Sequence, residues 1–338
     1  MTDIKKQGII AAGNWIVDHI KSIDVYPKED SLANITNEFF NNGGSPYNIL
    51  KDLSKMGAEF PLKGIGLVGN DTDGNWIIND CKQHNIDTNN LAIVNSPTSY
   101  TDVMVVESTG RRTFFHQRGA NRFLDIEHFN FSKSKEKMFH LGYLLLLDKL
   151  DEIDSKGVTN AAKVLKMAQN FGLKTSIDIV SENSARFHKI ILPSLPNVNY
   201  LFINEFEAQK TTEIKLNGDL PEFNLLSKAA KKLISMGVND WVFIHFPFGV
   251  YACNKTGKEI FQGSVKLPNK EIRSVVGAGD ALAAGILWGL HEDWSIEDTL
   301  KLGVCSAASS IQDFGCSDGI VHYKDCLKLG EKYSFYSF

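Results

Sequence analysis

Short apolar runs alternate with amphipathic stretches along most of the chain. Apolar runs rich in β-branched and aromatic residues are typical of buried strands, and apolar residues that recur with a helical period indicate helices. The expected strands are residues 9–17, 65–68, 138–147, 174–179, 200–203 and 241–245. The expected helices are residues 45–56, 73–84, 155–170, 224–236, 278–290 and 296–313. This alternation predicts a mainly parallel sheet with helices on both faces.

Two regions break the alternation. Residues 20–40 are polar and irregular. Residues 100–117 instead form two alternating β runs around a hairpin-like turn at residues 108–111, with no helix between them. We therefore expect a small antiparallel sheet that projects from the main body, where it could cover a ligand.

Composition and charge exclude several functions. The chain has 338 residues and a formal net charge of −4, so we expect no general attraction to nucleic acid or to anionic membranes. The longest apolar run, near residues 143–147, is too short to span a bilayer, and residues 1–7 carry no apolar signal-peptide core. The five cysteines are an odd number without a C-x-x-C pair, which favours reduced thiols over disulfides or a zinc site. We expect a cytoplasmic protein.

Residues 64–69 form a literal G-x-G-x-x-G motif, which raises the alternative of a dinucleotide-binding dehydrogenase. That fingerprint should follow a strand and open a helix, but here its interior residues are themselves the predicted strand. The helix begins only after residues 70–73. The motif is better explained by a strand in which glycines allow close packing.

A different glycine turn precedes the expected helix 278–290. It contains Gly277, Ala278, Gly279 and Asp280 and leads into a run of small residues. The glycines permit a tight turn, and the unpaired amides and dipole of the helix start suit a phosphate or a developing oxyanion. Asp280 could here accept a proton from a hydroxyl that attacks a phosphoryl group. The alternative is an acid that only stabilises the helix start.

Polar residues also follow two predicted strands. Asn204 and Glu207 come directly after the strand 200–203, at the carboxyl end where open α/β sheets bind ligands. Their oxygen atoms suit Mg²⁺, although the same residues fit an ordinary helix N-terminus. Asp18 ends the first strand, and its carboxylate could hold neighbouring hydroxyls or serve as a turn residue.

A second glycine turn, with Gly43 and Gly44, enters the helix 45–56. Ser45 and Pro46 predict its N-cap and its first turn. The turn amides could approach a ligand closely, and Asn48 could hydrogen-bond hydroxyl groups. The simpler interpretation is a strand-to-helix turn without a ligand.

In their order, these motifs resemble the ribokinase/PfkB family of carbohydrate kinases, and the resemblance runs from about Gly13 to Cys316. The matching residues are Gly13 to Asp18, Gly43, Gly44, Asn48, Gly66 to Asp71, Gly74, Asn204, Glu207 and Gly277 to Asp280. The combination of G-A-G-D with N-x-x-E is specific, whereas the Gly-Gly turn alone is not. The match of residues 66–71 removes most of the case for a dinucleotide site.

The resemblance implies a single ribokinase-like α/β domain over residues 1–338. This would be a three-layer sandwich with a mainly parallel central sheet and a small β lid, formed from segments near residues 20–40 and 100–119. The implied activity is that of an ATP-dependent kinase for a hydroxyl of a small sugar-like molecule, with Asp280 as the catalytic base beside Gly277, Ala278 and Gly279. The acceptor would lie between Asp280 and the residues Asp18, Gly43, Gly44 and Asn48.

The family also implies where ATP and Mg²⁺ would bind. ATP would lie over His245, Gly249 and Gly315, and Mg²⁺ would be held, partly through water, near Asn204 and Glu207. Three departures from the family pattern concern the nucleotide side. The leading Asp-Thr of the second signature is Ser274-Val275, the strand ending at Gly249 is one residue short, and a late Gly-Ala pair is Gly315-Cys316.

Two alternatives remain within this resemblance. One is a nucleoside kinase, since sugar and nucleoside present a similar ribose face. The other is a catalytically weak, sugar-binding regulatory paralogue, which the altered Ser274-Val275 leaves open. The expected partner is a small sugar-like substrate, with neither nucleic acid nor membrane, and the lid could support a homodimer.

Overall fold

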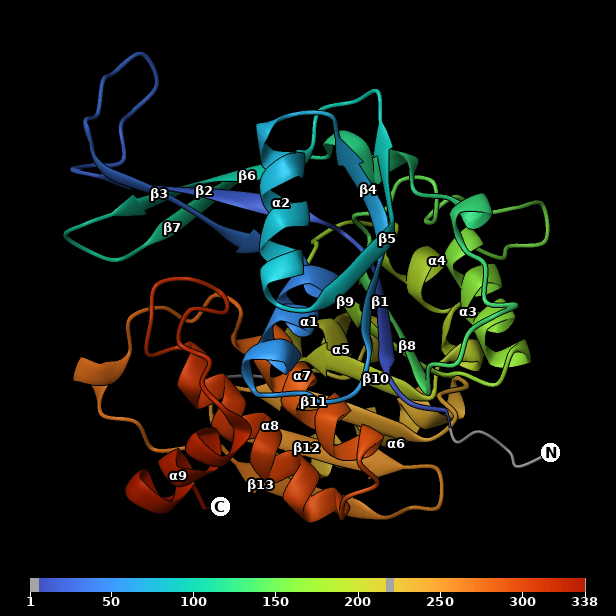
Figure 1. The fold of residues 1–338 in the computed structure, drawn as a ribbon. Helices are drawn as coiled ribbons and strands as arrows, with labels where there is room; N and C mark the ends of the chain where they lie inside the picture. Colours follow the sequence, from blue (N-terminus) through green and yellow to red (C-terminus); the bar gives the residue numbers. More distant parts are fainter. Residues whose placement is uncertain (1–5, 217–221, 338) are drawn as a thin grey trace.

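A computed structural model describes residues 6–216 and 222–337 (Figure 1). Within these residues the chain forms a nine-stranded sheet. In spatial order its strands are β13 (Glu259–Gly263), β12 (Gly249–Asn254), β11 (Trp241–Phe246), β10 (Tyr200–Asn204), β9 (Lys174–Ile179), β8 (Met138–Leu144), β1 (Ile9–Gly13), β4 (Leu62–Gly69) and β5 (Ile86–Val94). The pairing is parallel from β5 to β11, and β12 and β13 are added antiparallel. The predicted mainly parallel sheet is thus confirmed.

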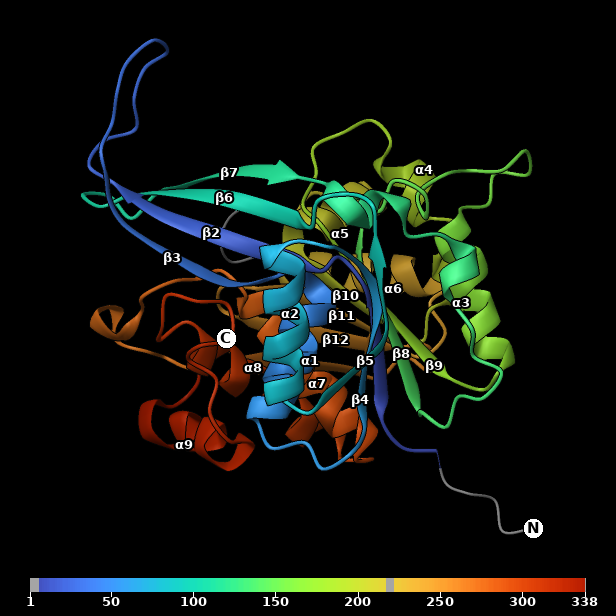
Figure 2. The ribbon, with the colours of Figure 1, turned by 45° about the horizontal axis from the view of Figure 1, so that its top comes forward.

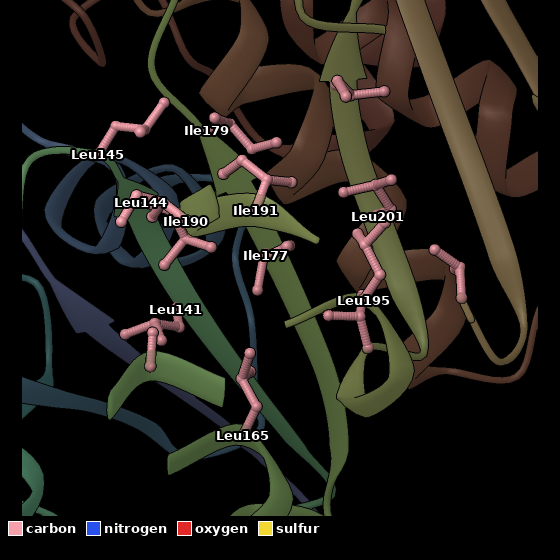
Figure 3. Packing of buried hydrophobic residues seen from close by; sticks show 14 of the residues in the cluster. Leu141, Leu144, Leu145, Leu165, Ile177, Ile179, Ile190, Ile191, Leu195 and Leu201 are labelled. Atoms are coloured by element: carbon pink, nitrogen blue, oxygen red, sulfur yellow. The ribbon is translucent and has the colours of Figure 1, made fainter. Parts of the chain in front are cut away.

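Helices cover both faces of this sheet (Figure 1). One face carries α1 (Ser45–Lys55), α2 (Thr72–Gln83), α7 (Ala278–His291), α8 (Ile296–Ser310) and α9 (Tyr323–Tyr333). The other carries α3 (Asn160–Asn170), α4 (Phe187–Ile191), α5 (Glu205–Thr212) and α6 (Phe223–Ser235). Figure 3 shows the second interface, where leucine and isoleucine side chains from β8, β9 and β10 pack against these helices. The two apolar cores fix the sheet edges rigidly.

A second, four-stranded sheet projects from the body (Figures 1 and 2). Its strands in spatial order are β3 (Ile35–Gly43), β2 (Ile16–Ile23), β6 (Ser99–Val106) and β7 (Arg112–Gln117). The predicted hairpin of residues 100–117 is present as β6 and β7. One expectation was wrong, because much of region 20–40 is regular strand and not irregular. The central pair of this sheet, β2–β6, is parallel. It is parallel because a long excursion through the body, including β4 and β5, separates β2 and β3 from β6 in the chain.

The predicted strand 9–17 is two strands in different sheets. β1 ends at Gly13 and β2 begins at Ile16. Gly13 has a φ of 130°, and a Cβ there would lie 1.7 Å from the carbonyl oxygen of Gly142. Only glycine fits this corner, where the chain leaves the central sheet for the projecting one.

The glycines of the G-x-G-x-x-G motif make room for a side chain. A Cβ at Gly66 would lie 2.2 Å from Cδ1 of Trp15, and one at Gly64 would lie 2.6 Å from its Cζ2. The buried indole donates a hydrogen bond of 3.0 Å to the carbonyl of Ile65, inside the motif. The glycines therefore serve packing within β4, and the dinucleotide alternative has no support here.

Most other element boundaries agree with the expectation to within a few residues. The helix 155–170 is shorter, since α3 begins at Asn160. The N-cap of α1 is Gly44, and Ser45 already lies in the helix. The strands β5, β12 and β13 and the helices α4, α5 and α9 were not predicted. No helix within the described ranges has both the length and the apolar character needed to cross a membrane.

Candidate active site

A cavity of about 320 Å³ lies at the carboxyl edge of the parallel strands. The ends of β8, β9, β10 and β11 form one side of it, and the start of α7 forms the other. Its polar lining consists of Tyr143, Asp178, Ser181, Asn204, Glu207, His245 and Asp280. The edge predicted to bind ligands therefore carries a group of carboxylates and amides.

Asp280 lies in the first turn of α7 and is only 6% exposed. One of its oxygens, Oδ2, accepts hydrogen bonds of 2.7 Å from Nδ2 of Asn48 and of 2.7 Å from the hydroxyl of Tyr143. Gly277 is the N-cap with a φ of 81°, and no side chain caps the helix. The turn is thus open to an anion, with an oriented carboxylate beside it.

Burial raises the pKa of Asp280 to about 7, and the negative charge of Asp178 adds to this rise. Hydrogen bonds from Asn48 and Tyr143 act in the opposite direction, because they favour the ionised form. A carboxylate with a pKa near neutrality is a much better proton acceptor than an exposed aspartate. The arrangement therefore suits general base catalysis.

Asp178 is a central residue of this cavity that the sequence patterns did not single out. It lies near the carboxyl end of β9, and its Oδ2 accepts a hydrogen bond from the hydroxyl of Ser45. Its other oxygen, Oδ1, is buried and has no hydrogen-bond partner among the described residues. A signal was available in the sequence, because Asp178 is a charged residue inside the correctly predicted strand 174–179, one residue before its carboxyl end.

Asn204 and Glu207 form a capping box at the start of α5. Glu207 Oε2 accepts a hydrogen bond of 2.9 Å from the Asn204 amide, and its Oε1 accepts one of 2.8 Å from Ser181. Burial raises the pKa of Glu207 to about 8. Both residues line the carboxylate cavity, so they cap a helix and face the site at once.

In the described parts of the chain, no cluster of three or more His, Cys, Asp or Glu is arranged to hold a metal.

A second cavity, of about 530 Å³, borders the first and shares Asn204, His245 and Gly279 with it. Its walls are mostly apolar and include Phe248, Val275, Leu282 and Tyr336. Burial lowers the pKa of His245 to about 4, which keeps the imidazole neutral between the two cavities. A ligand with a flat apolar group fits the larger cavity. Polar groups of the same ligand would extend past His245 toward the start of α7.

Two of the residues expected near ATP serve packing instead of lining this cavity. A Cβ at Gly249 would lie 2.5 Å from the carbonyl oxygen of Gln262 on the neighbouring strand. One at Gly315 would lie 2.0 Å from Nδ2 of Asn41 and 2.2 Å from a carboxylate oxygen of Asp318. Neither glycine is among the residues that line the larger cavity, whereas His245 lines both.

Asp18 lies on β2 of the projecting sheet, and the Gly43–Gly44 turn lies against it. A Cβ at Gly43 would come within 2.6 Å of the Asp18 carboxylate, so the glycine leaves this face open. Gly44 has a φ of 86°, which requires glycine at the start of α1. Burial raises the pKa of Asp18 to about 7. The thiol of Cys316 lies 3.9 Å from the carboxylate of Asp18. The charges of Asp18 and Asp280 both raise the pKa of this thiol, so Cys316 lies near both carboxylates.

Comparisons with known proteins agree with this geometry. The sequence model of the pfkB family carbohydrate kinases matches residues 12–322. A 5-dehydro-2-deoxygluconokinase of Clostridium beijerinckii is 26% identical over 299 residues, which cover 81% of this chain and 79% of that protein. The enzyme of the same name from Clostridium perfringens is 24% identical over 330 residues, covering 93% and 90%.

Solved structures show the same fold. The ribokinase of Thermotoga maritima superposes with a TM-score of 0.78 at 19% identity, covering 96% of this chain and 99% of that one. The ribokinase of Arabidopsis thaliana, solved with ribose and ATP, also has a TM-score of 0.78, at 20% identity, covering 96% and 98%. The predicted ribokinase-like fold is therefore confirmed.

Proposed function

Since this chain belongs to the pfkB family of carbohydrate kinases, we propose that it transfers the γ-phosphate of ATP to a hydroxyl group of a sugar or sugar acid. The observation that carries the proposal is the position of Asp280, a buried carboxylate oriented by Asn48 and Tyr143 at the uncapped start of α7. The clostridial relatives are named 5-dehydro-2-deoxygluconokinase, so 5-dehydro-2-deoxygluconate is one acceptor to test.

In this mechanism the acceptor hydroxyl attacks the γ-phosphorus and its proton passes to Asp280. The new O–P bond forms as the bond between the γ-phosphorus and the β,γ-bridging oxygen breaks, which leaves ADP. Backbone amides at residues 277–279 stabilise the charge that develops on the transferred group, because the helix start directs its N–H groups toward it. The protein therefore contributes position, one base and charge stabilisation.

The larger cavity would hold the base of ATP beside Phe248 and Tyr336, whose rings contact each other edge to face, and the phosphates would pass His245 toward α7. Asp178 lines the carboxylate cavity together with Asn204 and Glu207, and oxygen ligands of these types suit a hydrated Mg²⁺. When bound, Mg²⁺ would neutralise charge on the phosphates.

The four-stranded sheet would act as the lid, within a single kinase domain. It carries Asp18 above the Gly43–Gly44 turn, and the acceptor would lie between this turn, Asn48 and Asp280. Closure of such a lid excludes water and thereby limits hydrolysis of ATP.

The direct test measures ADP formation with ATP and Mg²⁺ against a panel of acceptors, with the phosphorylated product identified by mass spectrometry. The panel contains ketohexoses, pentoses, nucleosides and sugar acids, including 5-dehydro-2-deoxygluconate. We expect acceptor-dependent ADP formation with at least one sugar or sugar acid. Turnover with nucleosides alone, or binding of sugars without any phosphorylated product, would refute the proposal.

Replacing Asp178 by asparagine is expected to move the acid limb of the pH profile of kcat/KM to lower pH. The base must be ionised to accept a proton, so the rate should fall as pH drops below its pKa. The negative charge of Asp178 raises that pKa, and a neutral amide removes this effect. The exposed Asp325→Asn serves as the control and should leave the limb in place. If the acid limb of Asp178→Asn stayed in place or moved to higher pH, the charge of Asp178 would not be what raises the pKa of the catalytic base.

Replacing Asp18 by asparagine is expected to raise the KM of the acceptor about tenfold, with the affinity for ATP unchanged. A hydrogen bond from a hydroxyl to a carboxylate is worth about 1.5 kcal/mol more than its neutral replacement. Isothermal titration calorimetry with acceptor and with ATP separates the two effects. If the variant bound the acceptor as tightly as the unaltered protein, the acceptor would have to lie elsewhere.

A further inference from the structure

One face of the lid carries a continuous row of polar side chains. Asn41 on β3, Asp18 on β2, Thr101 on β6 and His116 on β7 are direct cross-strand neighbours. This face is turned toward the loop of residues 315–318, because Asn41 donates a hydrogen bond of 2.7 Å to Asp318 and Asp18 contacts Cys316. The row therefore forms the ceiling of the proposed acceptor site.

Two buried polar atoms in this row have no hydrogen-bond partner among the described residues. Nε2 of His116 is buried and forms no well-directed hydrogen bond to the described residues, although the backbone of Tyr100 lies near enough to the ring to raise its pKa. Nδ1 of the same ring lies 3.1 Å from the hydroxyl of Thr101. Oδ1 of Asn41 is also buried without a hydrogen bond. Buried polar groups without partners are uncommon in folded proteins and mark places where a ligand or water completes the bonding. A polyhydroxylated molecule would supply the missing donors and acceptors.

Arg112 lies on the same face, because it is four residues before His116 on the regular strand β7. Its side chain is half-buried, and burial lowers its pKa, while the charges of Cys316 and Asp18 act in the opposite direction. The charge of Asp18 therefore acts on the guanidinium group, which indicates that the two side chains share this face of the sheet. Yet Arg112 is in none of the ion pairs or side-chain hydrogen bonds found in the described part of the chain.

The neighbouring cations of the lid differ in this respect. Lys21 is paired with Asp102, and Arg118 lies 2.6 Å from Asp148. Arg111, next to Arg112, is exposed to solvent. A half-buried guanidinium group that forms no close ion pair within the described residues has free N–H donors for a negatively charged group of a ligand. A guanidinium group binds a carboxylate or a phosphate through two parallel hydrogen bonds. The names of the clostridial relatives, whose acceptor is a sugar acid, favour the carboxylate.

We propose that Arg112 determines acceptor specificity by binding a carboxylate, so that the acceptors of this kinase are sugar acids and not neutral sugars. This inference rests on the proposed function. One end of the acceptor would bind Arg112, its middle hydroxyl or carbonyl groups would face Asp18, Asn41 and His116, and the reacting hydroxyl would lie at Asp280. Neutral sugars of the same length leave the arginine unpaired and bind more weakly.

The test compares three acceptor classes by calorimetry in the absence of ATP and by initial rates in its presence. 5-Dehydro-2-deoxygluconate and D-gluconate represent sugar acids, D-fructose and D-glucose represent neutral sugars, and fructose 6-phosphate represents sugar phosphates. We expect the sugar acids to have the lowest KM and Kd. Preference for a neutral sugar, or for the sugar phosphate, would overturn the inference while leaving the kinase function intact. Binding of sugar acids without any turnover would instead remove only the kinase function.

The matched variants are Arg112→Met, Arg112→Lys and the adjacent control Arg111→Met. Arg112→Met should raise the Kd and KM of the sugar acid about 10- to 100-fold and leave the neutral sugars unchanged, since only the charge-assisted bonds are lost. Arg112→Lys keeps the positive charge but cannot donate two parallel hydrogen bonds, so its Kd and KM for the sugar acid should lie between those of the unaltered protein and Arg112→Met. Circular dichroism confirms folding, and the acid-to-neutral KM ratio of the unaltered protein remains decisive if a variant does not fold. An Arg112→Met protein that keeps the full preference for acids would overturn the assignment.

Discussion

Replacing Asp280 by asparagine is expected to lower kcat by about 10²–10⁴-fold, the usual contribution of a positioned general base. The amide keeps the shape of the side chain and can still accept a hydrogen bond from Asn48 or Tyr143, so the fold of the site should persist. What it loses is the ability to take the proton of the attacking hydroxyl. Single-turnover kinetics with ATP and acceptor measure this loss, and calorimetry checks that both ligands still bind.

Tyr143→Phe is the matched control for this experiment. It removes one of the two donors to Asp280 but leaves the carboxylate and the bond from Asn48. We expect a change in kcat of about tenfold, because one hydrogen bond to a carboxylate is worth about 1.5 kcal/mol. Near-normal turnover in Asp280→Asn would exclude this residue as the base, and losses of equal size in the two variants would assign the effect to misplacement of the side chain.

Asp280 illustrates how far the sequence reaches. Its place at a helix start follows from a local pattern, since two glycines precede a run of small apolar residues. The strand ends at Asn204 and His245 were predictable for the same reason, because apolar runs reveal where buried strands stop. Fold class needs no more than this local information, summed over the alternation of strands and helices.

What the sequence does not reveal depends on contacts between distant segments. Serine is a typical N-cap residue, but the hydroxyl of Ser45 instead donates a hydrogen bond to Asp178, 133 residues further along the chain. The strands β2 and β3 look irregular because a two-faced, partly exposed sheet lacks a clean apolar alternation. The sequence also gives no sign that Arg112 is unusual, because only the folded structure shows that it forms no ion pair with the other described residues.

Asp52 shows the same limitation most clearly, because nothing in its sequence context predicts burial. It lies on α1 one turn after Asn48 and is 0% exposed. Neither carboxylate oxygen of Asp52 accepts a well-directed hydrogen bond from the described residues, although the hydroxyl of Ser317 lies near enough to lower the Asp52 pKa. Burial raises its pKa well above the ordinary value, the Ser317 hydroxyl lowers it, and the charge of Asp280 raises it further.

Replacing Asp52 by asparagine is therefore expected to stabilise the protein at neutral pH, by about 1.4 kcal/mol for each pH unit over which only the unfolded chain is ionised. The sign follows from linkage: below the ordinary pKa of 3.8 both the folded and the unfolded state hold the proton, so the carboxyl carries no ionisation penalty. As pH rises above that value, the unfolded chain ionises freely while the folded one resists, and stability is lost until the raised folded pKa is reached.

The gain of Asp52→Asn over the unaltered protein should accordingly grow as the pH rises from 4 toward 8, measured by urea unfolding at each pH. The amide also brings two N–H donors to a region where a neighbour of Ser317, Asn42, has an unpaired oxygen. Asp80→Asn is the matched control, since Asp80 accepts hydrogen bonds from Tyr47 and Lys51 and its neutralisation should destabilise. A loss of stability in Asp52→Asn, or a gain independent of pH, would mean that Asp52 is ionised and compensated in the folded protein.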